Sequence, residues 1–310
     1  MGRSVGSICR VLREQGVRVA ERTYRAWKRA QPSVRDVEDA VVIDAILSVR
    51  VNEAGELSPE SMYGRRKMTA LLRRQGLNVS LRRVDRLMRL LGLNGLVRGN
   101  GARTTIPDRN AARAPDLLDR DFTADAPNLR WVADFTYVRT WTGFTYVSFV
   151  IDCFSRAIVG WHASTVKTTP LVTTAPRMGL WRRDRAGHPA GDGLIHHSDA
   201  GSQFTSVSFA ETLSLEGIAA SIGSIGDAYD NALAESTIGL FKNEAIRDGS
   251  PFRTGPLKTI DDVEWVTAGW VDWYNSRRLH STLGDVPPDE FEVVYYAGHE
   301  APHHPVLAPA

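Results

Sequence analysis

The sequence predicts an α/β fold, in which a mixed five-stranded sheet with flanking helices follows an all-α region. Two observations predict this fold. Residues 1–98 contain capped helical segments, whereas from about residue 128 short runs rich in β-branched and aromatic residues alternate with helical runs, in the order β-β-β-α-β-α-β-α. Residues 99–127 are rich in Gly, Pro, Asp, Asn and Arg, which predicts a linker between the two regions.

The composition is that of a globular protein, but its charge is unevenly divided. The 310 residues are 43% hydrophobic and carry a formal net charge of +2. Residues 1–105 hold 21 Lys and Arg against 10 Asp and Glu, whereas the rest of the chain holds 17 against 26. This asymmetry favours a basic half that meets a polyanion such as DNA, over the alternative of a solvated helical surface.

Other features of the composition argue against a membrane protein and against a zinc site. No apolar run approaches the roughly 18 residues needed to cross a bilayer, so we expect no membrane partner. Cys9 and Cys153 lie far apart in the sequence and fit no metal-ligand spacing. They are typical of small core residues in a reducing compartment, so we expect a cytoplasmic location.

Serine residues mark the expected helix starts within residues 1–98. Ser4 and Ser33 precede helical runs, and Ser58 precedes a third run that stops at Gly76. Ser80 then precedes LRRVDRLMRLLG, a helix with an arginine face. Two capped helices joined by a short turn predict a helix-turn-helix.

Basic residues are concentrated on this helix-turn-helix, which we place at about residues 58–92. Residues 61–98 contain ten Lys and Arg but a single acid, Asp85, which favours DNA binding over an ordinary solvated helical hairpin. The expected DNA contacts from this region are Arg65, Arg66, Lys67, Arg82, Arg83, Arg86 and Arg89.

The sheet region is expected to span residues 128–292, with a flexible tail at 293–310. Three β-rich runs, LRWVADFTYVRT, FTYVSFVIDCF and RAIVGWHAS, are separated by short turns and predict an antiparallel meander. Two short strands, GLIHHSD and IAASIG, alternate with helical runs. The last of these helices follows GDAYDN, in which Asp230 and Asn231 are the expected caps.

Three acids of this region could form a cluster of oxygen ligands. Asp134 lies inside an apolar strand, where an unpaired carboxylate is costly, Asp199 directly follows a short strand, and Glu235 lies early in a helix. Such a cluster suits Mg²⁺ or Mn²⁺. The alternative for each acid is structural: a carboxylate bonded to backbone amides, a turn or cap residue, and a surface acid.

Several neighbouring residues are interpreted as structural. Asp152 is expected to pair with Arg156 or to cap a turn. His196 and His197 are expected to pack and hydrogen-bond rather than to bind metal. Trp131 and Trp161 are expected to lie in the core.

The sequence resembles a known family in five phrases that follow the family's order. These are WVADFTYV, VIDCFSRAIVGW, HHSDAGSQF, GDAYDNALAES with FKNE downstream, and YNSRRLHSTLGDVPPDEF. With 35 residues between Asp199 and Glu235, the chain is similar to the second-reading-frame protein, OrfB, of the insertion-sequence-three family, which carries a retroviral-integrase-like core with a DDE motif. YGRRKMTALLRRQGLNVSLRRVDRLMRLLGL resembles that family's helix-turn-helix, and the similarity runs from about residue 5 to residue 292.

The resemblance implies a ribonuclease-H-like sheet with Asp134, Asp199 and Glu235 as catalytic residues that bind two Mg²⁺ or Mn²⁺ ions. It implies a transposase that cleaves DNA at the ends of a bacterial insertion sequence and transfers the freed 3′-hydroxyl to another strand. Lys242 would contact a phosphate of the transposon end. Arg278, in the distal motif, would have a structural or DNA-contacting role.

The same resemblance implies partners for the chain. We expect it to act on transposon ends and target DNA as a homo-oligomer, associated with the bacterial nucleoid. Because no leucine-zipper segment precedes residue 1, we also expect an upstream-frame OrfA-type protein, either as a partner or fused to this chain. Two other functions stay open: a non-catalytic DNA-binding regulator of transposition, and a nuclease on the same fold.

Overall fold

The structure is a computed structural model that describes residues 4–97, 116–118, 121–191, 193–199, 203–204, 206–223 and 231–299. The chain divides into two compact units, Met1–Ser48 and Val49–Ala310. Most of the expected linker at residues 99–127 lies outside the described residues, so that domain boundary stays a prediction. Within the described part of the chain, no helix combines the length and the apolar character needed to span a membrane.

The first unit is helical, and α1 and α3 begin where serines predict, whereas α2 follows Ala20 and has no side-chain cap. Helix α1 spans Val5–Glu14, α2 spans Glu21–Arg29 and α3 spans Val34–Arg50. The Ser7 amide donates to Ser4 Oγ (3.2 Å), which caps α1. At the start of α3, the Asp36 amide donates to Ser33 Oγ and the Ser33 amide donates to the Asp36 carboxylate, so two otherwise unpaired N–H groups are satisfied. Cys9 is buried and free, as expected.

The second unit begins with the helix-turn-helix region, where one expected helix start is wrong. The Ser58 hydroxyl donates to the Val49 carbonyl (2.5 Å) instead of capping a helix. Pro59–Met62 form a single 3₁₀ turn, and α4 spans only Arg65–Arg74 because the backbone of Tyr63 is extended. Helix α5, Leu81–Leu90, is capped by Ser80 as predicted, and it buries Val84, Leu87 and Met88.

Five strands then form one mixed sheet with the order β3-β2-β1-β4-β5. Strands β1, β2 and β3 form the predicted antiparallel meander, and β4 and β5 continue the sheet in parallel with β1. Their bounds are Arg130–Thr140, Gly143–Asp152, Ile158–Ser164, Ile195–Ser198 and Ala219–Ile222. The two-residue connection between β1 and β2, the alternation of buried residues along the second half of β1 and the continuous burial of the second half of β2 explain why sequence pattern alone could find this part of the sheet.

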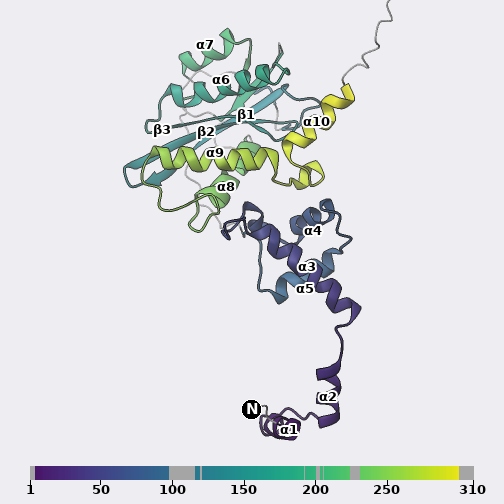
Figure 1. The fold of residues 1–310 in the computed structure, drawn as a ribbon. Helices are drawn as coiled ribbons and strands as arrows, with labels where there is room; N and C mark the ends of the chain where they lie inside the picture. Colours follow the sequence, from purple (N-terminus) through teal and green to yellow (C-terminus); the bar gives the residue numbers. More distant parts are fainter. Residues whose placement is uncertain are drawn as a thin grey trace, which may run out of the picture. The chain divides into compact units, whose positions relative to one another are not determined.

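Helices cover both faces of the sheet (Figure 1). Helices α6 (Thr169–Arg185) and α7 (Val207–Leu215) pack over one face, where Trp131 and Ala133 of β1 join their apolar side chains in one buried cluster. Helix α6 approaches so closely that a Cβ at Gly160 would lie 2.0 Å from the backbone oxygen of Ala175. Alternation along β1 therefore turns residue 134 to the opposite face.

The opposite face carries α8 (Ala232–Phe241) and α9 (Ile260–Ser276) (Figure 1). Phe149 of β2, which lies opposite Asp134 in the ladder, contacts the rings of Phe241 and Trp270 at centroid distances of 4.9 and 5.9 Å. A five-residue π-helix, Lys242–Ile246, follows α8 directly. Trp161 of β3 is only partly buried, so its expected place in the core is not borne out, whereas Trp131 is fully buried.

The last described residues form a helix that includes part of the segment where a flexible tail was expected. A 3₁₀ turn, Ser281–Leu283, leads to α10, which spans Pro288–His299 and therefore includes residues 293–299. Residues 300–310 lie outside the described residues.

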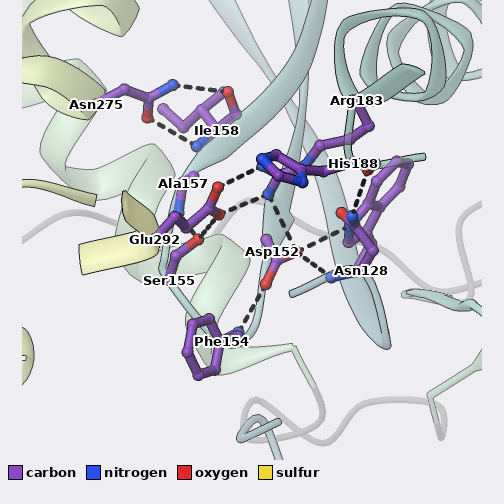
Figure 2. Close-up of polar contacts among 11 residues, drawn as sticks. Asn128, Asp152, Phe154, Ser155, Ala157, Ile158, Arg183, His188, Asn275 and Glu292 are labelled. Carbon is purple, nitrogen blue, oxygen red and sulfur yellow. Dashed lines mark hydrogen bonds and ion pairs between the residues drawn. The ribbon is translucent and has the colours of Figure 1, made fainter. Parts of the chain in front are cut away.

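A buried ion-pair network holds α10 against the sheet (Figure 2). The Arg183 guanidinium of α6 contacts Asp152 at the end of β2 (3.3 Å) and Glu292 of α10. The expected pairing of Asp152 with Arg156 is thus wrong, because Arg183, which lies 31 positions along the chain, takes that place. The expected turn cap is confirmed, since the Phe154 amide donates to Asp152 Oδ1 (2.8 Å).

Candidate active site

Two neighbouring parallel strands, β1 and β4, carry the two aspartates of the predicted cluster. In the ladder between β1 and β4, Ala133 lies opposite Ser198. The next residues along the two strands are Asp134 and Asp199. Because neighbouring strands lie about 4.8 Å apart, this register places both acids at the same level of the sheet, where β4 ends.

Asn231, which was predicted to cap helix α8, instead joins the start of this helix to β1 beside Asp134. Asn231 occupies the N-cap position of α8 but its side chain makes no capping hydrogen bond. Its Nδ2 instead donates to the backbone oxygen of Ala133 (2.9 Å), the residue before Asp134. Glu235 lies one helical turn further on, and its amide donates to the backbone oxygen of Asn231 (3.1 Å). Asp230, the other expected cap, lies outside the described residues.

The electrostatics of Asp134 show that these acids influence one another. Burial raises the pKa of the Asp134 carboxyl well above its ordinary value, and the negative charges of Asp199 and then Glu235 raise that pKa further. Two groups act in the opposite direction: the Phe135 amide, which donates to Asp134 Oδ1 at 2.7 Å, and the charge of Lys242. An inner strand thus presents a carboxylate to two further acids and one cation.

The carboxylates do not stand in ligating positions. Among the described residues, no group of three or more His, Cys, Asp or Glu side chains is arranged so that it could hold a metal ion. The hydrogen bond from the Phe135 amide also matches the structural alternative for Asp134. The fit to a metal rests on the type of ligand, because the three side chains are carboxylates, the ligands that Mg²⁺ and Mn²⁺ prefer.

The two histidines beside Asp199 are packed in the sheet, as predicted, but the predicted hydrogen bond is absent for His196, whose two ring nitrogens have no hydrogen-bond partner among the described residues. His196 is buried with its ring 5.4 Å from that of Phe209 of α7, on the face that Asp134 does not share. The Nδ1 atom of His197 lies 2.8 Å from Ser221 Oγ of β5. Burial lowers the pKa of His196 to about 4, so its ring is neutral near pH 7.

Lys242 connects the site to an exposed aromatic ring. It is the first residue of the π-helix, and burial lowers the pKa of its ammonium while Asp134 raises that pKa. The Nζ atom lies 5.2 Å from the centre of the Tyr137 ring on β1. Insertions of this kind in a helix recur at functional sites, because they re-aim the side chains that follow.

The basic residues of the helix-turn-helix region are largely exposed. Arg82, Arg86 and Arg89 point outward from α5, as do Arg65 and Arg66 from α4, whereas Arg83 and Lys67 are partly buried. Asp85 pairs with both Arg65 (3.0 Å) and Arg89 (2.7 Å), so the single acid of this segment is shared by two of its cations.

Arg278, in contrast, does not lie on a DNA-accessible surface. It is buried, and its guanidinium donates to the carboxylate of Glu244 through three hydrogen bonds of 2.7 to 3.2 Å. Trp270 Nε1 donates to the same carboxylate (3.1 Å). The FKNE and YNSRRLHS phrases therefore meet as a buried ion pair, and the role of Glu244 is one that sequence reasoning missed.

The helix-turn-helix region contacts the end of α9 within the same compact unit. The hydroxyl of Tyr63 accepts a hydrogen bond from the Leu279 amide (3.0 Å), and Trp273 Nε1 donates to Glu60 Oε1 (3.0 Å). Arg74 of α4 pairs with Glu290 of α10 (2.5 Å). These contacts come from residues more than 200 positions apart, which no local pattern predicts.

Comparisons with known proteins decide the family. Models of the integrase core domain match residues 124–228 and 216–288, and a model of an HTH-like domain matches residues 39–100. The transposase of insertion sequence element IS629 from Shigella sonnei is 47% identical over 236 residues, which cover 76% of this chain and 75% of that protein. Transposase InsF of insertion sequence IS3A from Escherichia coli (strain K12) is 30% identical over 295 residues, 93% of this chain and 94% of that protein. This chain belongs to the IS3 family of transposases.

The IS3-family assignment confirms the resemblance expected from the sequence and the fold class that it implied. The transposase has an integrase core and a preceding HTH-like region, and its family is one of DDE polynucleotidyl transferases. Among solved structures, the catalytic core domain of HTLV-2 integrase in complex with magnesium is 19% identical, covering 54% of this chain and 98% of that chain at a TM-score of 0.40. A simian T-cell lymphotropic virus intasome structure is 15% identical, covering 81% of this chain and 77% of that chain at a TM-score of 0.45.

Proposed function

We propose that this transposase cleaves DNA at the ends of its insertion sequence and transfers the freed 3′-hydroxyl to another strand, at a site made of Asp134, Asp199 and Glu235. The observation that supports the proposal most directly is the register of β1 and β4, which places Asp134 and Asp199 at the same level of the sheet, with the start of α8 hydrogen-bonded to the residue before Asp134. The charges of Asp199 and Glu235 also raise the pKa of Asp134, which supports a grouping of the three acids beside this inner strand.

The donor set fits one or two Mg²⁺ or Mn²⁺ ions. Bound there, such ions would lower the pKa of an attacking water or 3′-hydroxyl and stabilise the departing oxygen. The carboxylates bind and orient, and no covalent link between protein and DNA is needed.

Other residues of the site would hold the substrate and the acids in place. Lys242 would contact a phosphate beside the scissile bond, since its positive charge already acts on Asp134. Asn231 would keep α8, and with it Glu235, at a fixed distance from β1 through its bond to the Ala133 oxygen. The Phe135 amide would fix one oxygen of Asp134.

The remaining parts of the proposal concern DNA and partners. The exposed arginines Arg82, Arg86 and Arg89 of α5 would contact duplex DNA, with Arg65, Arg66, Lys67 and Arg83 beside them. Residues 1–98 would form the DNA-binding region and residues 128–292 the catalytic core. We propose that the protein works in the bacterial cytoplasm as a homo-oligomer on DNA, with an upstream-frame OrfA-type protein as its partner or fused to it.

The test is nicking and joining of a duplex that carries an end of the insertion sequence, with and without Mg²⁺. We expect Asp134→Asn, Asp199→Asn and Glu235→Gln each to abolish both reactions and to leave DNA binding in a mobility-shift assay largely unchanged. Glu211→Gln, a matched change of an exposed acid on α7, should be fully active.

Each outcome bears on a stated part of the proposal. Substantial activity in any of the three site variants refutes the assignment of that residue. Nicked products that are never linked to a second strand would point to a nuclease, and DNA binding without any metal-dependent product would point to a regulator.

A further inference from the structure

Next to the candidate active site, the surface carries two exposed aromatic rings in contact. Tyr137 of β1 and Phe144 of β2 are 43% and 50% exposed, and their rings meet edge to face with centroids 5.4 Å apart. Tyr137 lies opposite Tyr146 in the ladder, so Phe144, two residues along, lies on the same face of the sheet. A pair of large rings that is about half exposed marks a candidate interaction surface.

The ring of Tyr137 is joined to the acidic site by a single side chain. The Nζ atom of Lys242 lies 5.2 Å from the centre of that ring, and the charge of the same lysine acts on the Asp134 carboxylate. Tyr137 follows Asp134 by three residues on β1, so alternation turns the two side chains to opposite sides of the strand. Lys242 is therefore the side chain that links the exposed rings to the acids of the candidate site.

Cations accompany aromatic rings along this whole stretch. Lys167 lies 4.7 Å from the ring of Phe135, and Lys258 lies 5.5 Å from the ring of Trp141, which is 72% exposed at the end of the β1–β2 hairpin. With Lys242, three lysines therefore accompany three rings of residues 135–141. Alternating rings and cations are the surface that single-stranded nucleic acid selects, because bases stack on rings while phosphates pair with cations.

We propose that Tyr137 and Phe144 form a platform on which an unpaired base of the DNA strand end stacks, with Lys242 holding the adjoining phosphate. The inference rests on the proposed function, because it concerns the same DNA at the same site. Stacking would hold a frayed strand end in place after its base pairs open, so that its sugar–phosphate backbone runs past Asp134. Since every base has a π face, the platform would accept any of the four bases.

The test uses a probe whose signal does not depend on cleavage. A DNA duplex with a three-nucleotide unpaired 3′ tail carries 2-aminopurine in the tail, and full-length protein is added in EDTA. We expect the wild-type protein to quench the 2-aminopurine fluorescence by stacking. The Tyr137→Ala/Phe144→Ala double variant should remove that quenching and bind the tailed duplex on the order of 10- to 100-fold more weakly.

Three controls make the result specific. Binding of a blunt duplex should be unchanged in the double variant, and Tyr137→Trp, which keeps an aromatic ring, should retain the quenching. Trp181→Ala removes an exposed ring that carries a cation elsewhere, Arg185 at 5.4 Å on α6, and should leave quenching and affinity unchanged.

Quenching that survives in the double variant overturns the inference, as does an equal loss of affinity for blunt and tailed duplexes. A fall in the molar mass of the free protein on mutation, measured by light scattering, would show that the rings bind a second copy of the chain and would overturn it too. Because metal is absent, these outcomes are independent of whether the transposase cleaves.

Discussion

Replacement of Arg183 by methionine tests the buried network that connects α6, β2 and α10. The guanidinium lies between Asp152, which is fully buried at 0% exposure, and Glu292. Methionine fills a similar volume without charge, so Arg183→Met leaves two carboxylates facing each other without a cation. Removing one partner of a buried ion pair costs about 3–5 kcal/mol, which for a unit of this size lowers the melting temperature by roughly 6–20 °C.

The pKa of Asp152 gives this prediction a pH dependence with a definite sign. Burial raises that pKa, and Arg183 opposes the rise, so the variant should raise it further. An acid with a raised folded-state pKa contributes stability below its unfolded-state pKa and loses that contribution as pH rises through the folded value. The deficit of Arg183→Met relative to wild type should therefore be smaller at pH 5 than at pH 8.

Thermal unfolding followed by circular dichroism measures both effects. The matched control is Arg177→Met, which removes an exposed arginine of the same helix whose contact with Glu216 is 3.9 Å long. It should cost less than about 1 kcal/mol. The reasoning fails if Arg183→Met destabilises the protein no more than this control does, or if its deficit grows as the pH falls.

Two further predictions concern the candidate site and the DNA contacts. In EDTA, Asp134→Asn should raise the melting temperature at pH 8, because the raised pKa of Asp134 makes its ionised form unfavourable in the folded protein. This gain in melting temperature should vanish near pH 4, where the wild-type carboxyl is protonated in the folded protein. An unchanged melting temperature at pH 8 would contradict the electrostatics of Asp134 described above. Arg86→Ala should weaken duplex binding and reduce by about one the slope of the logarithm of the binding constant against the logarithm of the salt concentration. Arg278→Met should lower thermal stability and leave that slope unchanged, because Arg278 is buried. A reduced slope in both variants would show that Arg278 also contacts DNA.

The parts of the fold that sequence predicted correctly are those decided by local chemistry. Ser4, Ser33 and Ser80 cap helices because a hydroxyl accepts from the amide three residues on, wherever the chain goes next. The β1–β2–β3 meander was predictable because its turns are short. Ser58 failed the same rule, because the Val49 carbonyl, nine positions away, takes its hydroxyl.

The sequence singles out the acids of the candidate site, but it does not reveal the side chains that support them. A carboxylate inside an apolar strand, such as Asp134, is costly enough to draw attention without any knowledge of its partners. Asn231 carried the opposite signal, because its residue type and position match a helix cap, and only the approach of β1 turns its side chain to the Ala133 oxygen. Arg183 and Arg278 likewise pair with acids 31 and 34 positions away in the sequence, Asp152 and Glu244. The spacing of charges along the sequence does not predict pairs over such separations.

The contacts of Tyr63, Glu60 and Arg74 with the end of α9 and with α10 have a consequence for the proposed reaction on DNA. Because non-covalent contacts hold the helix-turn-helix region to the integrase core, their separation does not depend on the length of the chain that connects them. Under the proposed function, these side-chain contacts, rather than the length of the linker, would set the distance between the duplex bound by the helix-turn-helix region and the bond that is cut.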